Sequence, residues 1–231
     1  MSEPGQTLPR YAVYYAPPPG SAWYEFGRLW LAGQWRPAGV SPQVWTRSLR
    51  TPARYGFHAT LKAPFRLATG ITEAELLEWV ATLAHTLQPV ATGLLEPLGL
   101  EGYVALAPQK PPLALSALAA RCVLELDRLR APLNEAESAH RQREPLDARA
   151  SELLLAHGYP HVLERFRFHL TLASVADAQE AAHVVVCARK LIGALQRFDG
   201  LRLDRLCVFV ERSPGGIFER LRDFELGAVG V

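Results

Sequence analysis

Two short phrases of this sequence each join a histidine to a threonine two residues further along. One phrase reads FHATL and contains His58 and Thr60, and the other reads FHLTL and contains His169 and Thr171. Histidine exchanges a proton near neutral pH, and a hydroxyl group can hydrogen-bond an oxygen of a phosphate group. Two such phrases are therefore suited to acid–base chemistry on a phosphate ester.

Each phrase is rich in residues that favour strands, and side chains alternate between the two faces of a strand. On this pattern Lys62 continues the face of His58 in the first phrase, and Arg167 shares the face of His169 in the second. We expect these two cations to bind the substrate by neutralising charge on a phosphate. Two such strands facing each other would hold a phosphodiester between a base and an acid, with no need for a metal ion.

Other interpretations of the histidines are weaker. A single histidine in a strand is usually structural, but the repeated threonine offset favours a function. Zinc usually needs three or four close histidine, cysteine or carboxylate ligands, and neither phrase contains an acidic residue, so we expect no metal and no cofactor. Cys122, Cys187 and Cys207 are widely spaced in apolar surroundings, which indicates buried thiols in a reducing compartment rather than disulfides or a nucleophile.

The same order of predicted elements follows each histidine phrase. After the first phrase, Thr72 and Glu75 form the capping box of a helix, and two short strands follow around Gly102. After the second phrase, a helical pattern covers about 177–196, and two strands follow around the turn at 213–216. This duplicated βαββ pattern predicts an α+β fold.

The remaining segments complete the expected domain. Residues 10–16 read as a strand, on which Tyr11 could contact a base or a phosphate or could belong to the core. Residues 34–53 are rich in Pro, Gly and Ser and predict a loop. Residues 112–157 are rich in Ala, Leu and Arg and predict two or three helices between the two halves of a single domain spanning 1–231.

Charge limits the class of ligand. The net charge is only +2, whereas proteins that coat long nucleic acids usually have a strong basic excess, so a small anion or the end of a nucleic acid fits better. The cluster of Arg141, Arg143 and Arg149 is interleaved with Glu144 and Asp147, and it is either a lid over a ligand or a solvated helix face. No secretory signal and no apolar run of ~20 residues is found, so we expect a cytoplasmic protein without membrane contact.

Two His-x-Thr phrases on strands of a duplicated βαββ fold resemble the two-histidine phosphoesterase superfamily. The segments RYAVYYAP, RYGFHATLKAPF, GYPHVLERFRFHLTL and CVFVER resemble a branch of it that is encoded in phosphonate-utilisation operons and labelled as of unknown function. The resemblance implies two pseudo-symmetric lobes, each an antiparallel sheet with helices outside, and a cleft between the sheets. It also implies that the catalytic residues are His58, Thr60, His169 and Thr171.

Residues and resemblance together predict a phosphodiesterase that opens a small cyclic phosphate of a ribose or nucleotide to a monoester. Superfamily members also act on RNA ends, so an RNA ligase or trimming nuclease with the same residues is an alternative. A third alternative is a non-catalytic phosphate-binding module, which is disfavoured because it does not need two titratable histidines. The sequence does not determine the oligomeric state.

Overall fold

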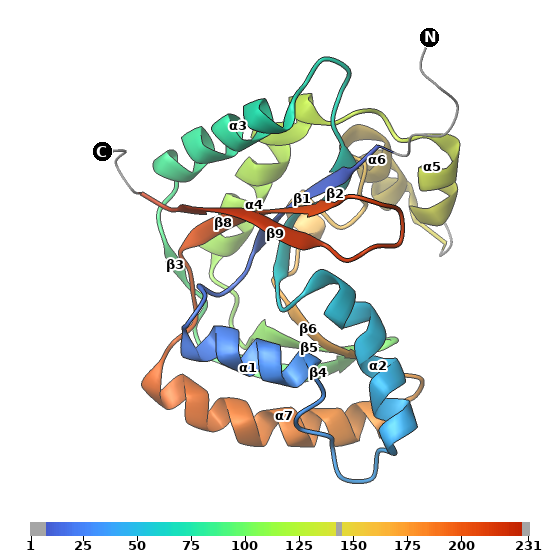
Figure 1. Cartoon of the computed structure of the whole chain (residues 1–231), viewed down its shortest axis with the longest axis vertical. Coiled ribbons are helices and arrows are strands. Elements are labelled where there is room, and N and C mark those ends of the chain that lie inside the picture. The colour runs from blue at the N-terminus through green and yellow to red at the C-terminus, as the bar shows by residue number, and fades with distance from the viewer. Residues whose placement is uncertain (1–7, 142–144, 228–231) are drawn as a thin grey trace.

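Two antiparallel sheets lie at the centres of two lobes in the computed structural model, which describes residues 8–141 and 145–227 (Figure 1). The strands are β1 (Arg10–Tyr15), β2 (Ala59–Arg66), β3 (Val90–Ala91), β4 (Leu95–Leu100), β5 (Tyr103–Pro108), β6 (Leu170–Ser174), β7 (Arg202–Leu203), β8 (Arg205–Glu211) and β9 (Glu219–Glu225). The α-helices are α1 (Ala22–Leu31), α2 (Pro42–Tyr55), α3 (Glu73–Thr86), α4 (Leu113–Leu126), α5 (Glu135–Arg141), α6 (Ala148–His157) and α7 (Ala178–Phe198).

Each half of the duplicated sequence contributes strands to both sheets. The first sheet has the order β2-β1-β8-β9, so the strand after His58 lies in one sheet with the C-terminal hairpin. The second sheet has the order β4-β5-β6, so the strand after His169 pairs with the hairpin of the first half. The expected α+β fold with two antiparallel lobes is therefore confirmed, and the two histidine phrases belong to different sheets.

Helices pack against both sheets. Helix α3 packs on β8 and β9, and α4 packs on β2, whereas α7 packs on β4 and β5 and α2 packs on β6 (Figure 1). The capping box that Thr72 and Glu75 predict is present at the start of α3. The helices predicted between residues 112 and 157 correspond to α4, α5 and α6.

The prediction of a loop over residues 34–53 is wrong in its second half, because α2 begins at Pro42. Ser41 caps this helix, and its hydroxyl group accepts a hydrogen bond from the backbone N–H of Val44. Proline is compatible with the first turn of a helix, where its missing N–H has no partner to lose. Trp45 and Leu49 recur at helical spacing and are buried. The proline content therefore concealed an amphipathic helix.

One hydrophobic core continues through both lobes and fixes β6 against the N-terminal elements. The indole N–H of Trp30 on α1 donates a 2.9 Å hydrogen bond to the carbonyl oxygen of Leu172 on β6. The rings of Tyr15 and Phe168 lie 6.2 Å apart. Among the described residues, no helix is long and apolar enough to cross a membrane.

Candidate active site

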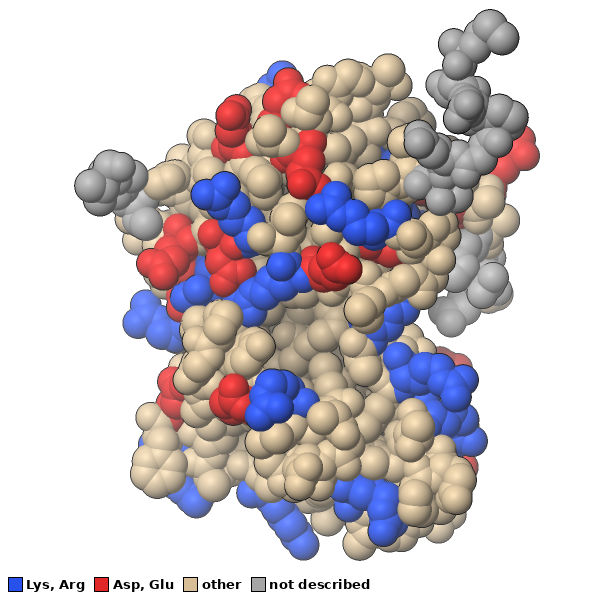
Figure 2. Space-filling view, in the orientation of Figure 1, with Lys and Arg blue, Asp and Glu red and all other residues tan. Residues whose placement is uncertain are grey.

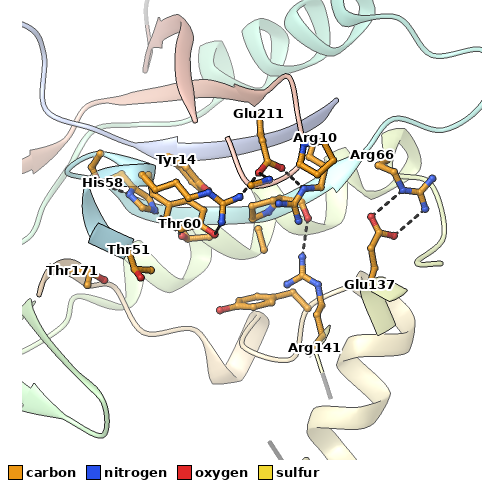
Figure 3. A pocket seen from close by; sticks show the side chains of 18 of the residues that line it. Arg10, Tyr14, Thr51, His58, Thr60, Arg66, Glu137, Arg141, Thr171 and Glu211 are labelled. Carbon is orange, nitrogen blue, oxygen red and sulfur yellow. Dashed lines mark hydrogen bonds and ion pairs between the residues drawn. The ribbon is translucent and has the colours of Figure 1, made fainter. Parts of the chain in front are cut away.

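A cavity of about 920 Å³ receives side chains from β1, α2, β2, α5 and β6. In the space-filling view, the surface is hollowed between the upper and lower lobes (Figure 2). His58, Thr60 and Thr171 line the cavity, so residues of both histidine phrases meet in it although they belong to different sheets. The close-up shows Thr171 on a separate segment from His58 and Thr60 (Figure 3).

The ring of His58 is oriented by the backbone just before β2. Its Nδ1 atom lies 2.9 Å from the carbonyl oxygen of Gly56. A carbonyl oxygen only accepts hydrogen bonds, so Nδ1 carries a proton and Nε2 is the basic atom of the neutral ring. Thr60 Oγ1 lies 3.4 Å from this Nε2 atom. The phrase thus presents a basic nitrogen and a hydroxyl group side by side.

Burial keeps the His58 ring neutral. The ring of Tyr14 lies over it, with 4.0 Å between centroids and 30° between planes. Desolvation lowers the pKa of His58 to about 4, the hydrogen bond to Gly56 opposes this shift, and the positive charge of His169 adds to it. His58 is therefore a neutral base at pH 7.

The second phrase repeats the orientation of the first. His169 Nδ1 lies 2.8 Å from the carbonyl oxygen of Arg167, which again stands two residues before the histidine. Its Nε2 atom is thereby the nitrogen that remains for a ligand. Thr171 lines the cavity, and His169 is close enough for its charge to affect the pKa of His58. His169 itself is not among the residues that line the cavity, so the second phrase contributes Thr171 to the lining.

The expectation that Lys62 shares the face of His58 is corrected by the structure. Thr60 pairs with Tyr14, whereas Lys62 pairs with Val13, so Leu61 is an extra residue in β2. Such a bulge changes the face on which the following side chain lies. The Lys62 ammonium group is buried away from the cavity, where it binds Asp127 at 3.0 Å and the Val123 carbonyl oxygen at 3.3 Å.

Arg167 and Tyr11 also lie outside the cavity lining. The guanidinium group of Arg167 is exposed and donates to the carbonyl oxygens of Glu164 and Phe166. Tyr11 is buried in the core, and its hydroxyl group donates to Glu73 at 2.9 Å. The core position was one of the two alternatives for Tyr11. Tyr14, on the opposite face of the same strand, lies beside His58.

Four arginines line the cavity, and the residue pattern pointed to only one of them, Arg141, as a possible lid residue; the other three are Arg10, Arg54 and Arg66. Arg66 lines the cavity although Lys62 does not, because a second register shift lies between Lys62 and Phe65, and Arg10 pairs directly with Arg66 across the sheet. Arg54 was hidden because its helix was read as a loop.

The described members of the 141–149 cluster lie in different places. Arg141 lines the cavity and donates to the carbonyl oxygen of Pro64 at 2.8 Å. Arg149 lies on the surface, where it pairs with Glu152 and Glu164. Arg143 lies outside the described residues.

The three cysteines do not line the cavity. Cys122 and Cys207 are buried, and burial raises the pKa of each thiol to about 12, whereas Cys187 is only half-buried. Across residues 8–141 and 145–227, no group of three or more His, Cys, Asp or Glu side chains is arranged to hold a metal ion.

The fold and site define a two-lobed protein in which each sheet brings residues of one His-x-Thr phrase to a shared cavity, His58 and Thr60 from one sheet and Thr171 from the other. The resemblance to the two-histidine phosphoesterases implies such a cleft between the sheets. The chain belongs to the DUF1045 family, described as "Protein of unknown function", whose model matches residues 60–219. This match confirms the expectation of a branch that is labelled as of unknown function.

Two curated proteins named "Ribose 1,5-bisphosphate phosphokinase PhnN" are similar to this chain. The one from Janthinobacterium sp. (strain Marseille) is 36% identical over 227 residues, and the one from Laribacter hongkongensis (strain HLHK9) is 38% identical over 223. Each alignment covers 92% of this chain but only 50% and 51% of those proteins, respectively. The chain therefore spans about half the length of the curated relatives it matches.

Three solved structures also align with the chain, each at 13% identity. They are a phosphoesterase with a TM-score of 0.47, E. coli LigT complexed with NADP+ with a TM-score of 0.42, and Kluyveromyces marxianus Usb1 with a TM-score of 0.40. The alignments cover 95%, 95% and 92% of this chain and 99%, 98% and 98% of those chains.

Proposed function

We propose that this protein is a phosphodiester hydrolase that opens a small cyclic phosphate of a ribose or nucleotide to a monoester, with His58 as general base and His169 as general acid. The observation that carries the proposal is the matched orientation of the two imidazoles. In each ring Nδ1 is held by the carbonyl oxygen two residues earlier, which leaves Nε2 for the substrate.

The state of His58 supports its assignment as the base. Burial lowers its pKa to about 4, so its Nε2 atom has a lone pair at neutral pH. A water molecule on phosphorus would lose its proton to this atom as the new P–O bond forms. A base with a low pKa is weak, and a neutral His58 brings no positive charge to phosphorus. The second histidine is therefore the better source of positive charge near phosphorus during the reaction.

His169 completes the proton balance. In its protonated form its Nε2–H donates to the ester oxygen as the P–O bond of the ring breaks, so the leaving group departs as a neutral hydroxyl group. After one turnover His58 holds a proton and His169 has lost one, and exchange with water restores the starting state. Thr60 and Thr171 donate hydroxyl hydrogen bonds to the non-bridging phosphate oxygens. Both proton transfers come from side chains, so the proposed chemistry needs no metal ion.

The substrate class has separate support. A cavity of about 920 Å³ is within the size range of small-molecule sites, and the net charge of +2 provides little long-range attraction to a polyanion. The relatives are named for a kinase that acts on a ribose bisphosphate, and a phosphorylated ribose would suit a protein of the same family. A role in phosphonate metabolism is part of this proposal.

The experiment is a screen of the purified protein against cyclic and linear phosphodiesters, with and without a chelator. We expect cyclic ribose or nucleoside phosphates to be opened to monoesters at a rate that chelation does not change. Activity that is lost on chelation and restored by zinc would instead indicate a metal site. Binding of phosphate esters without turnover of any of them would support the non-catalytic module.

The RNA-end alternative is separated by substrate length and salt. Catalytic efficiency is compared on mononucleoside cyclic phosphates and on oligonucleotides that end in a cyclic phosphate, at low and high salt. Higher efficiency on the oligonucleotides, with a steep loss as salt rises, would favour the RNA-end enzyme.

A further inference from the structure

The cavity that is lined by His58, Thr60 and Thr171 has a strongly basic end. The close-up shows Arg10, Arg66 and Arg141 displaced from His58 and Thr171 along the cavity (Figure 3). Among the described residues, the permanently charged side chains that line the cavity are Arg10, Arg54, Arg66, Arg141, Glu137 and Glu211. Four guanidinium groups thus accompany two carboxylates, and this one cavity has an excess of two positive charges.

Each of the two carboxylates already forms ion pairs with particular arginines. Glu211 is buried, and it binds Arg10 Nε at 2.5 Å and also binds Arg54. Glu137 binds Arg66 through both of its oxygens, at 2.9 and 3.0 Å. Since Arg10 uses its Nε atom for Glu211, this ion pair fixes the plane of its guanidinium group without engaging the terminal nitrogens.

Arg141 has no carboxylate bound to it among the described residues. Its Nη2 atom donates to the carbonyl oxygen of Pro64 at 2.8 Å, and its guanidinium carbon lies 5.0 Å from the centroid of the Tyr159 ring. Both contacts orient the guanidinium group, and neither neutralises its positive charge. Burial lowers the pKa of Arg141, and the charge of Arg10 lowers it further, so the two cations are close enough to repel each other.

We propose that Arg10 and Arg141 form a second anion subsite, which binds a phosphate monoester on the same small molecule whose phosphodiester lies between His58 and His169. The proposal rests on the proposed function and adds the substrate class, a cyclic phosphodiester with a second phosphate that does not react. Two oriented guanidinium groups provide several donors to one phosphate, and the anion relieves their repulsion. The cavity is also larger than a single phosphate requires.

The kinetic test compares adenosine 2′,3′-cyclic phosphate with the same compound carrying a 5′-phosphate. We expect the wild-type kcat/KM to be at least ~10-fold higher for the 5′-phosphorylated compound, the range for a hydrogen bond to a charged group. Arg141→Gln should lose at least ~10-fold more kcat/KM on the phosphorylated compound than on the other, mainly through KM. Arg149→Gln is the matched control, because Arg149 lies on the surface and pairs with Glu152 and Glu164.

Equal efficiency of the wild type on both compounds, or an equal loss on both in Arg141→Gln, would overturn the subsite. An oligonucleotide that ends in a cyclic phosphate places a diester where the monoester would lie. If it were hydrolysed more efficiently than the 5′-phosphorylated mononucleotide, the monoester assignment would be wrong.

A binding measurement keeps the subsite separate from catalysis. Adenosine 5′-phosphate is titrated calorimetrically into the His58→Ala protein, in which the reaction is disabled. We expect Arg141→Gln in this background to weaken binding at least ~10-fold and Arg149→Gln to leave it unchanged. Loss of turnover on every cyclic phosphate would refute the proposed function but not this result, whereas binding that does not depend on Arg141 would refute the subsite alone.

Discussion

The ring of Tyr14 covers the imidazole of His58, with 4.0 Å between the two ring centroids. Tyr14 comes from the strand that pairs with β2, and its direct partner across that pairing is Thr60. The pairing of β1 with β2 thus sets the environment of the histidine as well as the position of the threonine. Since desolvation is the largest cause of the lowered pKa of His58, Tyr14 is a positioning residue that keeps the base neutral.

Replacement of Tyr14 should change the pH dependence of the reaction. In the wild type, the acid limb of the profile of kcat/KM against pH should fall near pH 4, because His58 must be unprotonated and its pKa is lowered to about 4. Tyr14→Leu admits water to the imidazole, and the limb should move up towards the ordinary histidine value of about 6.5. Tyr14→Phe retains the ring and should retain the limb.

Tyr11→Phe is the matched control for this experiment, because Tyr11 lies on the opposite face of the same strand and binds Glu73. Its acid limb should coincide with that of the wild type. An acid limb that did not move in Tyr14→Leu would show that Tyr14 does not set the pKa of His58.

Both histidines should be essential and neither should replace the other. We expect His58→Ala and His169→Ala each to lower kcat by ~10²-fold or more, the range for loss of a general acid or base. Circular dichroism and the melting temperature should stay near those of the wild type, because neither side chain belongs to the hydrophobic core clusters. His85→Ala, on the exposed face of α3, is the control, and near-normal turnover in either active-site variant would refute paired catalysis.

His58 should also make folding stability depend on pH. Between about pH 6.5 and pH 4 the unfolded chain binds a proton at this histidine and the folded chain does not, so stability falls as pH falls through that window. His58→Gln should remove this contribution and give a shallower decline. The free energy of unfolding in urea, measured at several pH values, checks it.

His85→Gln, on the exposed face of α3, is the control for removal of a histidine. Parallel curves for the wild type and His58→Gln would mean that the folded and unfolded proteins protonate His58 equally.

Lys62 should contribute to stability rather than to substrate binding. Lys62→Met removes the bond to Asp127, which still keeps its bond from Arg130 Nε at 3.0 Å. We expect a loss of about 1.5–3 kcal/mol in the free energy of unfolding, the range for a hydrogen bond that involves a charged group. Because Lys62 lies outside the cavity, KM should stay close to the wild-type value.

Lys190→Met, on the exposed side of α7, provides the control for removal of a lysine charge. A large rise in KM in Lys62→Met, without a change in stability, would restore the binding role that the residue pattern suggested.

The sequence alone was sufficient for the features that depend on local spacing. The repeated His-x-Thr phrases, the capping box of Thr72 and Glu75 and the glycine turn near Gly102 predicted the duplicated halves and most elements. These signals work because the period of a strand and the capping of a helix involve residues only a few positions apart. The helix at Pro42–Tyr55 was missed because composition outweighed the helical spacing of its buried residues.

Tertiary structure decided which side chains accompany the histidines. A period of two places Lys62 beside His58, but the extra residue Leu61 in the pairing with β1 turns Lys62 to the opposite face. Tyr14 rather than Tyr11 lies beside His58, because Tyr14 pairs with Thr60 across the two strands whereas Tyr11 lies in the core and binds Glu73. Arg10 and Arg141 meet in the cavity from segments far apart in the chain. Bulges and contacts between distant segments arise from the packing of partner strands. The spacing of residues along the chain therefore does not predict them.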